Sequence, residues 1–270
     1  MVKALSKVAI LTTLLALASV ICPGQAAAAN PQKTRPIEVG ELLTYEGKLS
    51  KIIPGITVAD LRFEVQKDPN SDGLVFKTMA TSKGTLLKLF RFSFLQQYES
   101  LVDNESFQIL KTTKHDVQKD RVRDSEAVFD YKDNRVRYTE TDPTNPNRPP
   151  RRIASVLNGM IHDIVSGIYA IRRMPLAVGN SFKMTVSDSG LVYTVPVRVT
   201  AREQQKSILG RSWCYRVEPA IFGHDRLIEQ KGGMIIWLTD DARRIPVRSR
   251  IDTEFGRIEV RLRTVSPAVK

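Results

Sequence analysis

Histidine and aspartate are the residues of this sequence best suited to acid–base or metal chemistry, and they occur side by side three times. Each of the three histidines in the 270-residue chain is followed by aspartate, at His115-Asp116, His162-Asp163 and His224-Asp225. A metal centre needs three or four converging ligands, and phosphohydrolases that use His-Asp pairs hold them on an all-helical scaffold. Only His162-Asp163 falls in a segment with helical periodicity. We therefore expect no metal site and no cofactor.

Two adjacent carboxylates, Asp240-Asp241, are a second candidate for acid–base work. They lie between an apolar run and Arg243-Arg244-Ile245-Pro246, where aspartate commonly accepts hydrogen bonds from turn amides and pairs with arginine. We expect this turn role. The sequence has no Gly-x-Ser-x-Gly, no His-Glu-x-x-His and no glycine-rich phosphate loop. The prediction is a protein that is not an enzyme; a hydrolase that uses His224, Asp225 and these two aspartates stays open as an alternative.

The first 29 residues have the three parts of a secretory signal peptide. Lys3 and Lys7 precede an apolar run over residues 8–21, and four alanines end the segment at Ala29. The run is shorter than the ~20 residues that span a bilayer as a helix, so we predict cleavage near Ala29, with an uncleaved anchor as the alternative. Cleavage lowers the formal charge from +12 to +10 because both lysines are lost. The predicted location is the bacterial periplasm.

The two cysteines, Cys22 and Cys214, fit this location. Ile21 stands before Cys22, where lipid attachment needs a small residue, so we expect no lipid anchor. Cleavage leaves Cys214 alone and without a disulfide partner, which suits a periplasm better than a eukaryotic exterior. Cys214 lies between Trp213 and Tyr215 with no base beside it, so it is predicted to be a buried structural thiol.

Strands must position any site in this chain, because apolar and polar residues alternate through most of it. Residues 57–66 show the alternation, which is typical of a half-buried strand. After a loose lead over 30–37 we predict a single β-rich domain over 38–266. Its two halves cover 38–141 and 176–266.

A proline-rich loop over 142–150 and an amphipathic helix over 151–174 are predicted to join the halves. The helix prediction rests on apolar residues at intervals of three and four: Ile153, Val156, Leu157, Met160, Ile161, Ile164, Val165 and Ile168. We expect this apolar face to be core, with lipid contact as the alternative. The predicted fold is mainly β, a curved antiparallel sheet or incomplete β-barrel packed on one central amphipathic helix.

Three segments carry a family resemblance: residues 40–45, the helical motif Asp163-x-x-Ser166-x-x-Tyr169-x-x-Arg172, and residues 236–247. Together they resemble the bacterial exported proteins grouped as domain of unknown function 3108, from about Val39 to Thr264. The resemblance implies an envelope protein of mainly antiparallel β structure and supplies no established activity. We expect a structural role for the motif residues, which are Tyr45, Asp163, Tyr169, Arg172, Trp237, Asp240, Asp241 and Arg244.

The basic charge points to an anionic partner. Export makes nucleic acid improbable as that partner, whereas an anionic membrane surface, a lipid headgroup or an acidic polysaccharide is available in the envelope. We therefore predict a non-enzymatic envelope protein that binds an amphiphilic or anionic molecule, with peripheral membrane contact. The alternative is a scaffold that binds another protein by a sheet edge. The sequence does not indicate an oligomeric state.

The last two strands offer the sharpest candidate site, formed by four arginines. A hairpin turning at 255–256 sets Ile251 against Val260, and it then places Arg250 opposite Arg261. The same register places Arg248 opposite Arg263. Opposed like charges destabilise a sheet by up to ~1 kcal/mol per pair, so they need compensation. Acidic neighbours such as Glu229 or Asp240, or solvent, supply it in one interpretation; in the other, the four guanidiniums bind phosphate or carboxylate groups.

Overall fold

The computed structural model describes residues 37–50, 55–85, 88, 91–254 and 256–266. The predicted signal peptide at 1–29 and nearly all of the predicted lead at 30–37 lie outside these residues. Among the described residues, no helix is long and apolar enough to cross a membrane.

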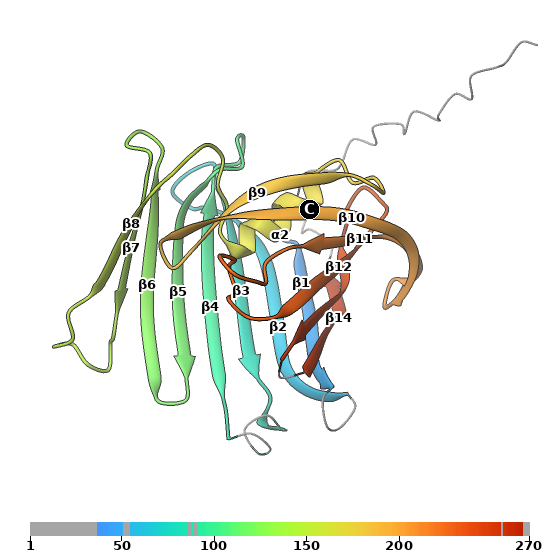
Figure 1. Cartoon of the computed structure of the whole chain (residues 1–270), viewed down its shortest axis with the longest axis horizontal. Helices are drawn as coiled ribbons and strands as arrows, with labels where there is room; N and C mark the ends of the chain where they lie inside the picture. The colour runs from blue at the N-terminus through green and yellow to red at the C-terminus, as the bar shows by residue number, and fades with distance from the viewer. Residues whose placement is uncertain (1–36, 51–54, 86–87, 89–90, 255, 267–270) are drawn as a thin grey trace, which may run out of the picture. The chain divides into compact units, whose positions relative to one another are not determined.

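One antiparallel sheet contains all the named strands, so the two β-rich halves of the sequence share a single sheet (Figure 1). The order across it is β8-β7-β6-β5-β4-β3-β2-β1-β14-β13-β12-β11-β10-β9. The first half contributes β1 (Leu42–Ser50), β2 (Ile56–Lys67), β3 (Leu74–Ser82), β4 (Phe94–Val102), β5 (Ile109–Gln118), β6 (Arg121–Asp130), β7 (Arg135–Thr141) and β8 (Arg151–Val156). The second half contributes β9 (Ser181–Asp188), β10 (Leu191–Ser207), β11 (Gly210–Pro219), β12 (Gly232–Thr239), β13 (Pro246–Thr253) and β14 (Gly256–Ser266). The fold is therefore mainly β, with one large open antiparallel sheet.

The helix is shorter than predicted. Helix α2 covers Ile164–Arg173, whereas residues 151–156 form the edge strand β8 and pair with β7. The prediction of a helix over 151–174 is wrong for its first half, because two apolar residues, Ile153 and Val156, are too few to establish a helical period there. Consequently the apolar residues do not form one buried face: Val156 and Met160 are exposed, at 63% and 48%.

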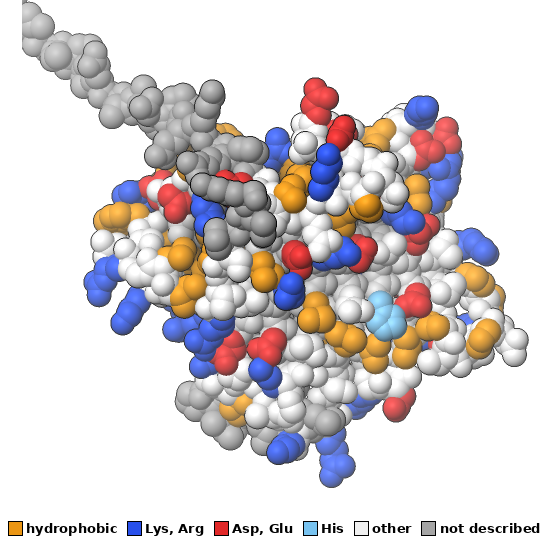
Figure 2. All heavy atoms as spheres, turned by 180° about the vertical axis from the view of Figure 1, so that it is seen from behind, with side chains coloured by type: hydrophobic (Ala, Val, Ile, Leu, Met, Phe, Trp, Pro, Cys, Tyr) orange, Lys and Arg blue, Asp and Glu red, His pale blue; other side chains and the backbone are white. Residues whose placement is uncertain are grey.

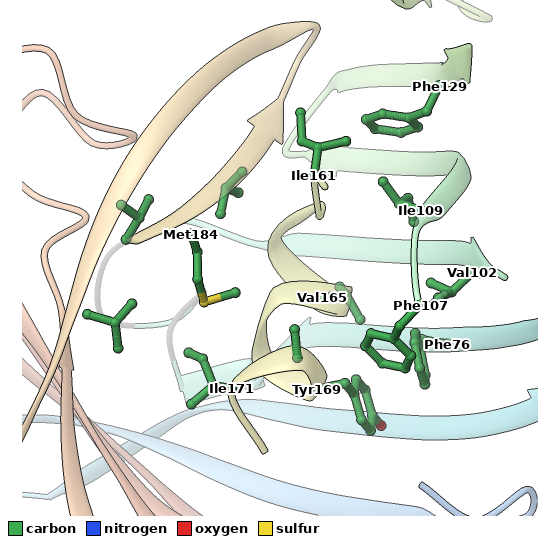
Figure 3. Packing of buried hydrophobic residues seen from close by; sticks show 14 of the residues in the cluster. Phe76, Val102, Phe107, Ile109, Phe129, Ile161, Val165, Tyr169, Ile171 and Met184 are labelled. Atoms are coloured by element: carbon green, nitrogen blue, oxygen red, sulfur yellow. The ribbon is translucent and has the colours of Figure 1, made fainter. Parts of the chain in front are cut away.

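Helix α2 packs against the sheet through a large apolar cluster. Val165, Tyr169 and Ile171 from the helix join side chains from both halves of the sheet, and Figure 3 shows several of them converging. The Tyr169 ring stacks on the Phe76 ring of β3, with centroids 4.1 Å apart and planes 10° apart. The helix therefore couples the two halves through hydrophobic burial, which is the main stabilising term in a core of this kind.

The sheet curls enough for its two ends to touch, although they do not pair. The Ser155 hydroxyl of β8 donates to the carbonyl of Gly190, in the turn between β9 and β10, at 2.6 Å. Gly190 has φ +82°, and a Cβ there would lie 2.5 Å from the Tyr138 Cβ. Both the positive φ and the close approach require glycine. In Figure 1, β9 and β10 cross over α2 on their way to this contact.

The register of the last hairpin differs from the predicted one by two residues. Ile251 faces Ile258, Arg250 faces Glu259, and Arg248 faces Arg261. The predicted pairs Arg250–Arg261 and Arg248–Arg263 are therefore wrong. A shift of two residues keeps every side chain on its own face, so the apolar pattern could not distinguish the two registers. Position 255 of the predicted turn lies outside the described residues.

Candidate functional site

Asp163 fixes the start of helix α2 to the sheet. Its Oδ1 accepts from the Ser166 backbone N–H at 2.7 Å, and the Ser166 hydroxyl accepts from the Asp163 backbone N–H at 3.0 Å, which completes a capping box. Its other oxygen, Oδ2, accepts from the hydroxyls of Ser100 on β4 and Thr112 on β5. The cap thus determines where the helix begins and ties it to two strands of the first half.

Arg172 fixes the other end of the helix. Its guanidinium is buried and donates to both carboxylate oxygens of Glu41, at 2.5 and 2.8 Å. It also donates from Nε and Nη2 to the Arg243 carbonyl, at 3.2 and 3.0 Å. A fork of this geometry compensates the desolvation of both charges. The side chain therefore joins the helix to the start of β1 and to the turn between β12 and β13.

Asp240 and Asp241 occupy that turn. Asp241 Oδ1 accepts from the Thr239 hydroxyl and from the backbone N–H groups of Arg243 and Arg244, each at 2.9 Å. The Arg244 guanidinium donates to the carbonyl of Arg172 at 3.1 Å. Asp240 instead pairs with Arg202 at 2.6 Å. Asp241 therefore accepts hydrogen bonds from the amides of the turn, and Arg244 joins the turn to the end of the helix.

Trp237 and Tyr45 lie in a second apolar cluster beside this network. The Trp237 indole N–H donates to Glu203, and the Arg248 guanidinium lies 4.8 Å from the indole centroid. Tyr45 meets Phe63 edge to face at 5.5 Å. The structure therefore brings the three family-motif segments together at helix α2, where Arg172 binds Glu41 and Arg244 binds the Arg172 carbonyl. Asp163, Trp237 and Asp240 instead bind residues outside the motifs.

An apolar hollow of about 140 Å³ opens between helix α2 and strands β1, β2, β12, β13 and β14. Its walls are mainly hydrocarbon and aromatic: Leu43, Tyr45, Leu61, Phe63, Ile168, Tyr169, Met234, Ile236, Pro246, Ile251 and Val260, with Arg172, Arg248 and Ser249 completing the lining. Several wall residues are only partly buried, among them Ile168, Met234 and Ile251. The hollow is therefore accessible from outside, and contact with its walls would remove further apolar surface from water.

A second apolar hollow, of about 80 Å³, continues along the helix on the side of β9 and β10. It shares Ile168, Met234 and Ile236 with the first hollow. Neither hollow was predicted from the sequence. Ile168 and Met234 are the residues that could have indicated them. Both are apolar, and both line the two hollows while remaining only partly buried.

Two phenols lie in the wall of the first hollow. Tyr169 is 2% exposed, and its hydroxyl has no hydrogen-bond partner among the described residues. Burial raises the pKa of Tyr169 far above its ordinary value, and it raises the pKa of Tyr45 in the same way. Both side chains therefore stay protonated and keep an O–H donor.

Each of the four arginines of the predicted anion site has an acidic partner on β13, on β14 or on the adjacent strand β1. Arg248 and Arg261 both bind Glu259, at 2.5 and 2.7 Å. Arg250 lies 3.0 Å from Asp252, and Arg263 pairs with Glu46. Glu229 and Asp240, the two acids that we predicted, are not among these partners. The compensation comes from acids other than those we predicted. On the face drawn in Figure 2, basic and acidic side chains are likewise interspersed rather than segregated.

The three His-Asp pairs lie in unlike surroundings. His162 and Asp163 are buried, whereas the side chains of His224 and Asp225 are 92% and 83% exposed. His115 contacts Asp124 of the next strand, at 2.5 Å, instead of its own neighbour. The described residues contain no group of three His, Cys, Asp or Glu side chains placed to hold a metal ion.

Cys214 is fully buried, as predicted, and burial raises the pKa of its thiol to about 11. A thiol with so high a pKa is almost entirely protonated at neutral pH and reacts slowly. It is therefore part of the packing of the second apolar cluster.

The fold and these contacts define the class of protein: a large curved antiparallel sheet, with one described helix attached to it by buried hydrogen bonds and an ion pair. The chain belongs to the family described as "Protein of unknown function (DUF3108)", which it matches over residues 43–263. The resemblance in its three motif segments is thus confirmed. No curated protein matches the chain.

One solved structure supports the fold. A beta-barrel-like protein of domain of unknown function DUF1849 from Brucella abortus aligns with a TM-score of 0.58 at 10% identity, covering 85% of this chain and 98% of that one. A putative exported protein with a YmcC-like fold from Bacteroides fragilis aligns with a TM-score of 0.32, also at 10% identity, over 86% of this chain and 98% of its own. At 10% identity the first structure, with its TM-score of 0.58, is a likeness of fold alone.

Proposed function

We propose that the protein is a non-enzymatic binding protein of the bacterial periplasm, and that it holds the apolar chain of an amphiphilic envelope molecule against helix α2. In this proposal the sheet is an incomplete barrel with α2 at its centre. The hollow between α2 and strands β1, β2 and β12–β14 is the observation that carries the proposal.

The size of the hollow sets what it can hold. An apolar protein cavity of about 150 Å³ stays dry and takes up benzene, so a hollow of about 140 Å³ suits on the order of six carbons. At about 0.8 kcal/mol for each buried methylene, six contribute about 5 kcal/mol. That corresponds to a Kd of a few tenths of a millimolar. The adjoining hollow and a contact to the polar end of the ligand would have to supply tighter binding.

A sheet-edge scaffold has less physical support. The edge strand β8 is six residues long and exposes Arg151 and Arg152. Two prolines, Pro149 and Pro150, come directly before it. Short length, positive charge and neighbouring proline are devices that discourage pairing with another strand. We therefore favour ligand binding over edge pairing.

The test is a titration with N-phenyl-1-naphthylamine, a neutral probe that fluoresces in apolar sites. Wild-type protein should bind it saturably. Ile168→Trp fills the space between the two hollows and should abolish binding, whereas Ile208→Trp, on the exposed turn between β10 and β11, should not. Absence of saturable binding to the wild type, or equal loss in both variants, would overturn the proposal. Solvent extraction of protein from the native host, followed by lipid mass spectrometry, then identifies the natural occupant.

A further inference from the structure

The Tyr169 hydroxyl is a buried donor with nothing to bind. It lies in the wall of the apolar hollow, and the described residues offer it no hydrogen-bond partner. Buried polar groups are nearly always paired, so an unpaired one calls for an explanation. In Figure 3 the phenol oxygen is at the end of the ring that points away from the helix, toward the strands that supply Leu43, Tyr45, Leu61 and Phe63 to the same hollow.

The ring itself is held firmly in place. It stacks on Phe76 at 4.1 Å on one side, and the Arg172 guanidinium lies 5.2 Å from its centroid. Arg172 cannot turn toward the hydroxyl, because its donors are engaged by Glu41 and by the Arg243 carbonyl. The stacked ring thus fixes the hydroxyl in position, and Arg172 is not free to satisfy it.

The hydrogen-bonding capacity of the hydroxyl selects the kind of group that could pair with it. Two guanidiniums, those of Arg172 and Arg243, lie within 4 Å of the single Glu41 carboxylate, at 2.5 and 3.5 Å. At the Tyr169 hydroxyl the Arg172 cation is opposed by the Glu41 and Glu64 carboxylates, so these charges do not by themselves select an anion. The unpaired O–H is a donor, and an oxygen acceptor satisfies it. Away from the Tyr169 hydroxyl, the hollow is lined mainly by apolar side chains. An acyl group, with one carbonyl or carboxylate oxygen and an apolar chain, matches both parts.

The geometry points to Tyr169 as the hydrogen-bond donor to the acyl oxygen of the bound amphiphile, with the acyl chain running past Ile168 and Met234 into the second hollow. The polar end of the acyl group then lies against the helix and its tail continues between α2 and β9–β10. This inference rests on the proposed function, because it names the ligand class and the orientation in the same hollow. The acyl oxygen could belong to a free fatty acid or to an ester.

Tyr169→Phe tests the inference, since it removes the hydroxyl and keeps the stacked ring. N-phenyl-1-naphthylamine, which has no acyl oxygen, reports on the hollow, and displacement of this probe by decanoic acid and by methyl decanoate reports on the polar contact. We expect the probe to bind the variant within twofold of the wild type. Both acyl ligands should bind about tenfold more weakly, which is the effect of one ordinary hydrogen bond. Tyr193→Phe, on β10 and outside both hollows, is the matched control and should change neither.

The outcomes distinguish a wrong orientation of the ligand from a failure of the proposed function. A tenfold loss for both ligands supports an ester or acid carbonyl as the acceptor, and a loss confined to decanoic acid supports a free carboxylate. Unchanged acyl binding in Tyr169→Phe, with the probe still bound, overturns the orientation but leaves the hollow as a binding site. If the wild type does not bind the probe, the proposed function fails first. A thermal melt at or above that of the wild type verifies that the variant is folded.

Discussion

Arg172 and Glu41 form a buried two-point ion pair across 131 residues of sequence. The pair joins the last turn of helix α2 to the residue just before β1, and so connects the middle of the chain to the start of the folded part. Both side chains are at most 5% exposed, so water cannot solvate either charge if its partner is removed.

Removal of one partner should therefore be costly. We expect Glu41→Leu to lower the free energy of unfolding by about 3–5 kcal/mol, because it leaves the Arg172 charge buried and uncompensated. The double variant Glu41→Leu with Arg172→Met should recover most of that loss. Urea denaturation followed by tryptophan fluorescence measures both. A loss below about 1 kcal/mol in the single variant would show that the pair does not constrain the helix.

The Asp163 cap gives a second stability prediction. Asp163→Ala removes the cap, which is worth about 1–2 kcal/mol, and leaves the hydroxyls of Ser100 and Thr112 without their buried acceptor. We expect a total loss of about 3 kcal/mol in the free energy of unfolding. Asp103→Ala, which removes a similar contact to Ser106 in an exposed loop, is the control. Equal shifts of the urea midpoint in the two variants would contradict a special role for Asp163.

Local patterns in the sequence predicted the strands well and the long-range contacts poorly. The turn that joins β6 to β7 has a local signal in Lys132-Asp133-Asn134, and Asn134 adopts φ +51° there. Strand β8 was missed because six residues cannot distinguish a period of two from intervals of three and four. The true start of the helix does have a local signal, the Asp163-x-x-Ser166 capping pattern.

The site could not be predicted because its parts come from distant segments. Glu41 belongs to residues 40–45, one of the three segments that carry the family resemblance. No residue near it in the sequence indicates that its carboxylate binds Arg172. The hollow depends on how far the sheet curls around the helix, which is set by bulges such as those at Val199–Ala201 and Trp237–Leu238. Bulges bend and twist a sheet without a reliable sequence pattern.

His162 should make the protein less stable in acid. Burial lowers the pKa of His162 to about 4; the nearby Asp163 raises it and Arg173 lowers it further. Because the folded pKa is below the unfolded value of about 6.5, the unfolded chain takes up a proton first as pH falls. Stability is thus full above pH 6.5 and is lost as pH falls toward 4, by about 2 kcal/mol at pH 5.

His162→Leu removes this titration, so its free energy of unfolding should change less than that of the wild type between pH 7 and pH 5. Urea midpoints at half-unit intervals of pH measure the difference, and carboxylates elsewhere cancel in the comparison. Parallel curves for the two proteins would show that His162 does not titrate in this range.

The arginine face gives the last prediction. Arg250 and Arg261 lie on the adjacent strands β13 and β14, each beside an acid, Asp252 or Glu259. Each basic residue near an anionic membrane contributes about 1 kcal/mol, and their acids reduce this. We therefore expect Arg250→Ser with Arg261→Ser to weaken binding to vesicles of phosphatidylglycerol and phosphatidylethanolamine by about five- to tenfold at low salt. The difference should vanish at 0.3 M salt, because ions screen exposed charges.

A matched pair of cations lies on another hairpin, where Lys206 faces Arg211 across β10 and β11. Lys206→Ser with Arg211→Ser removes the same charge from a different place, so net charge is equal in the two double variants. A site on the β13–β14 face requires the Arg250 and Arg261 variant to lose more binding than this control, as measured by vesicle co-sedimentation. Equal losses would mean that vesicles respond only to total charge. If the wild type itself does not sediment with vesicles at low salt, this face is simply solvated and its arginines serve to neutralise Glu259 and Asp252.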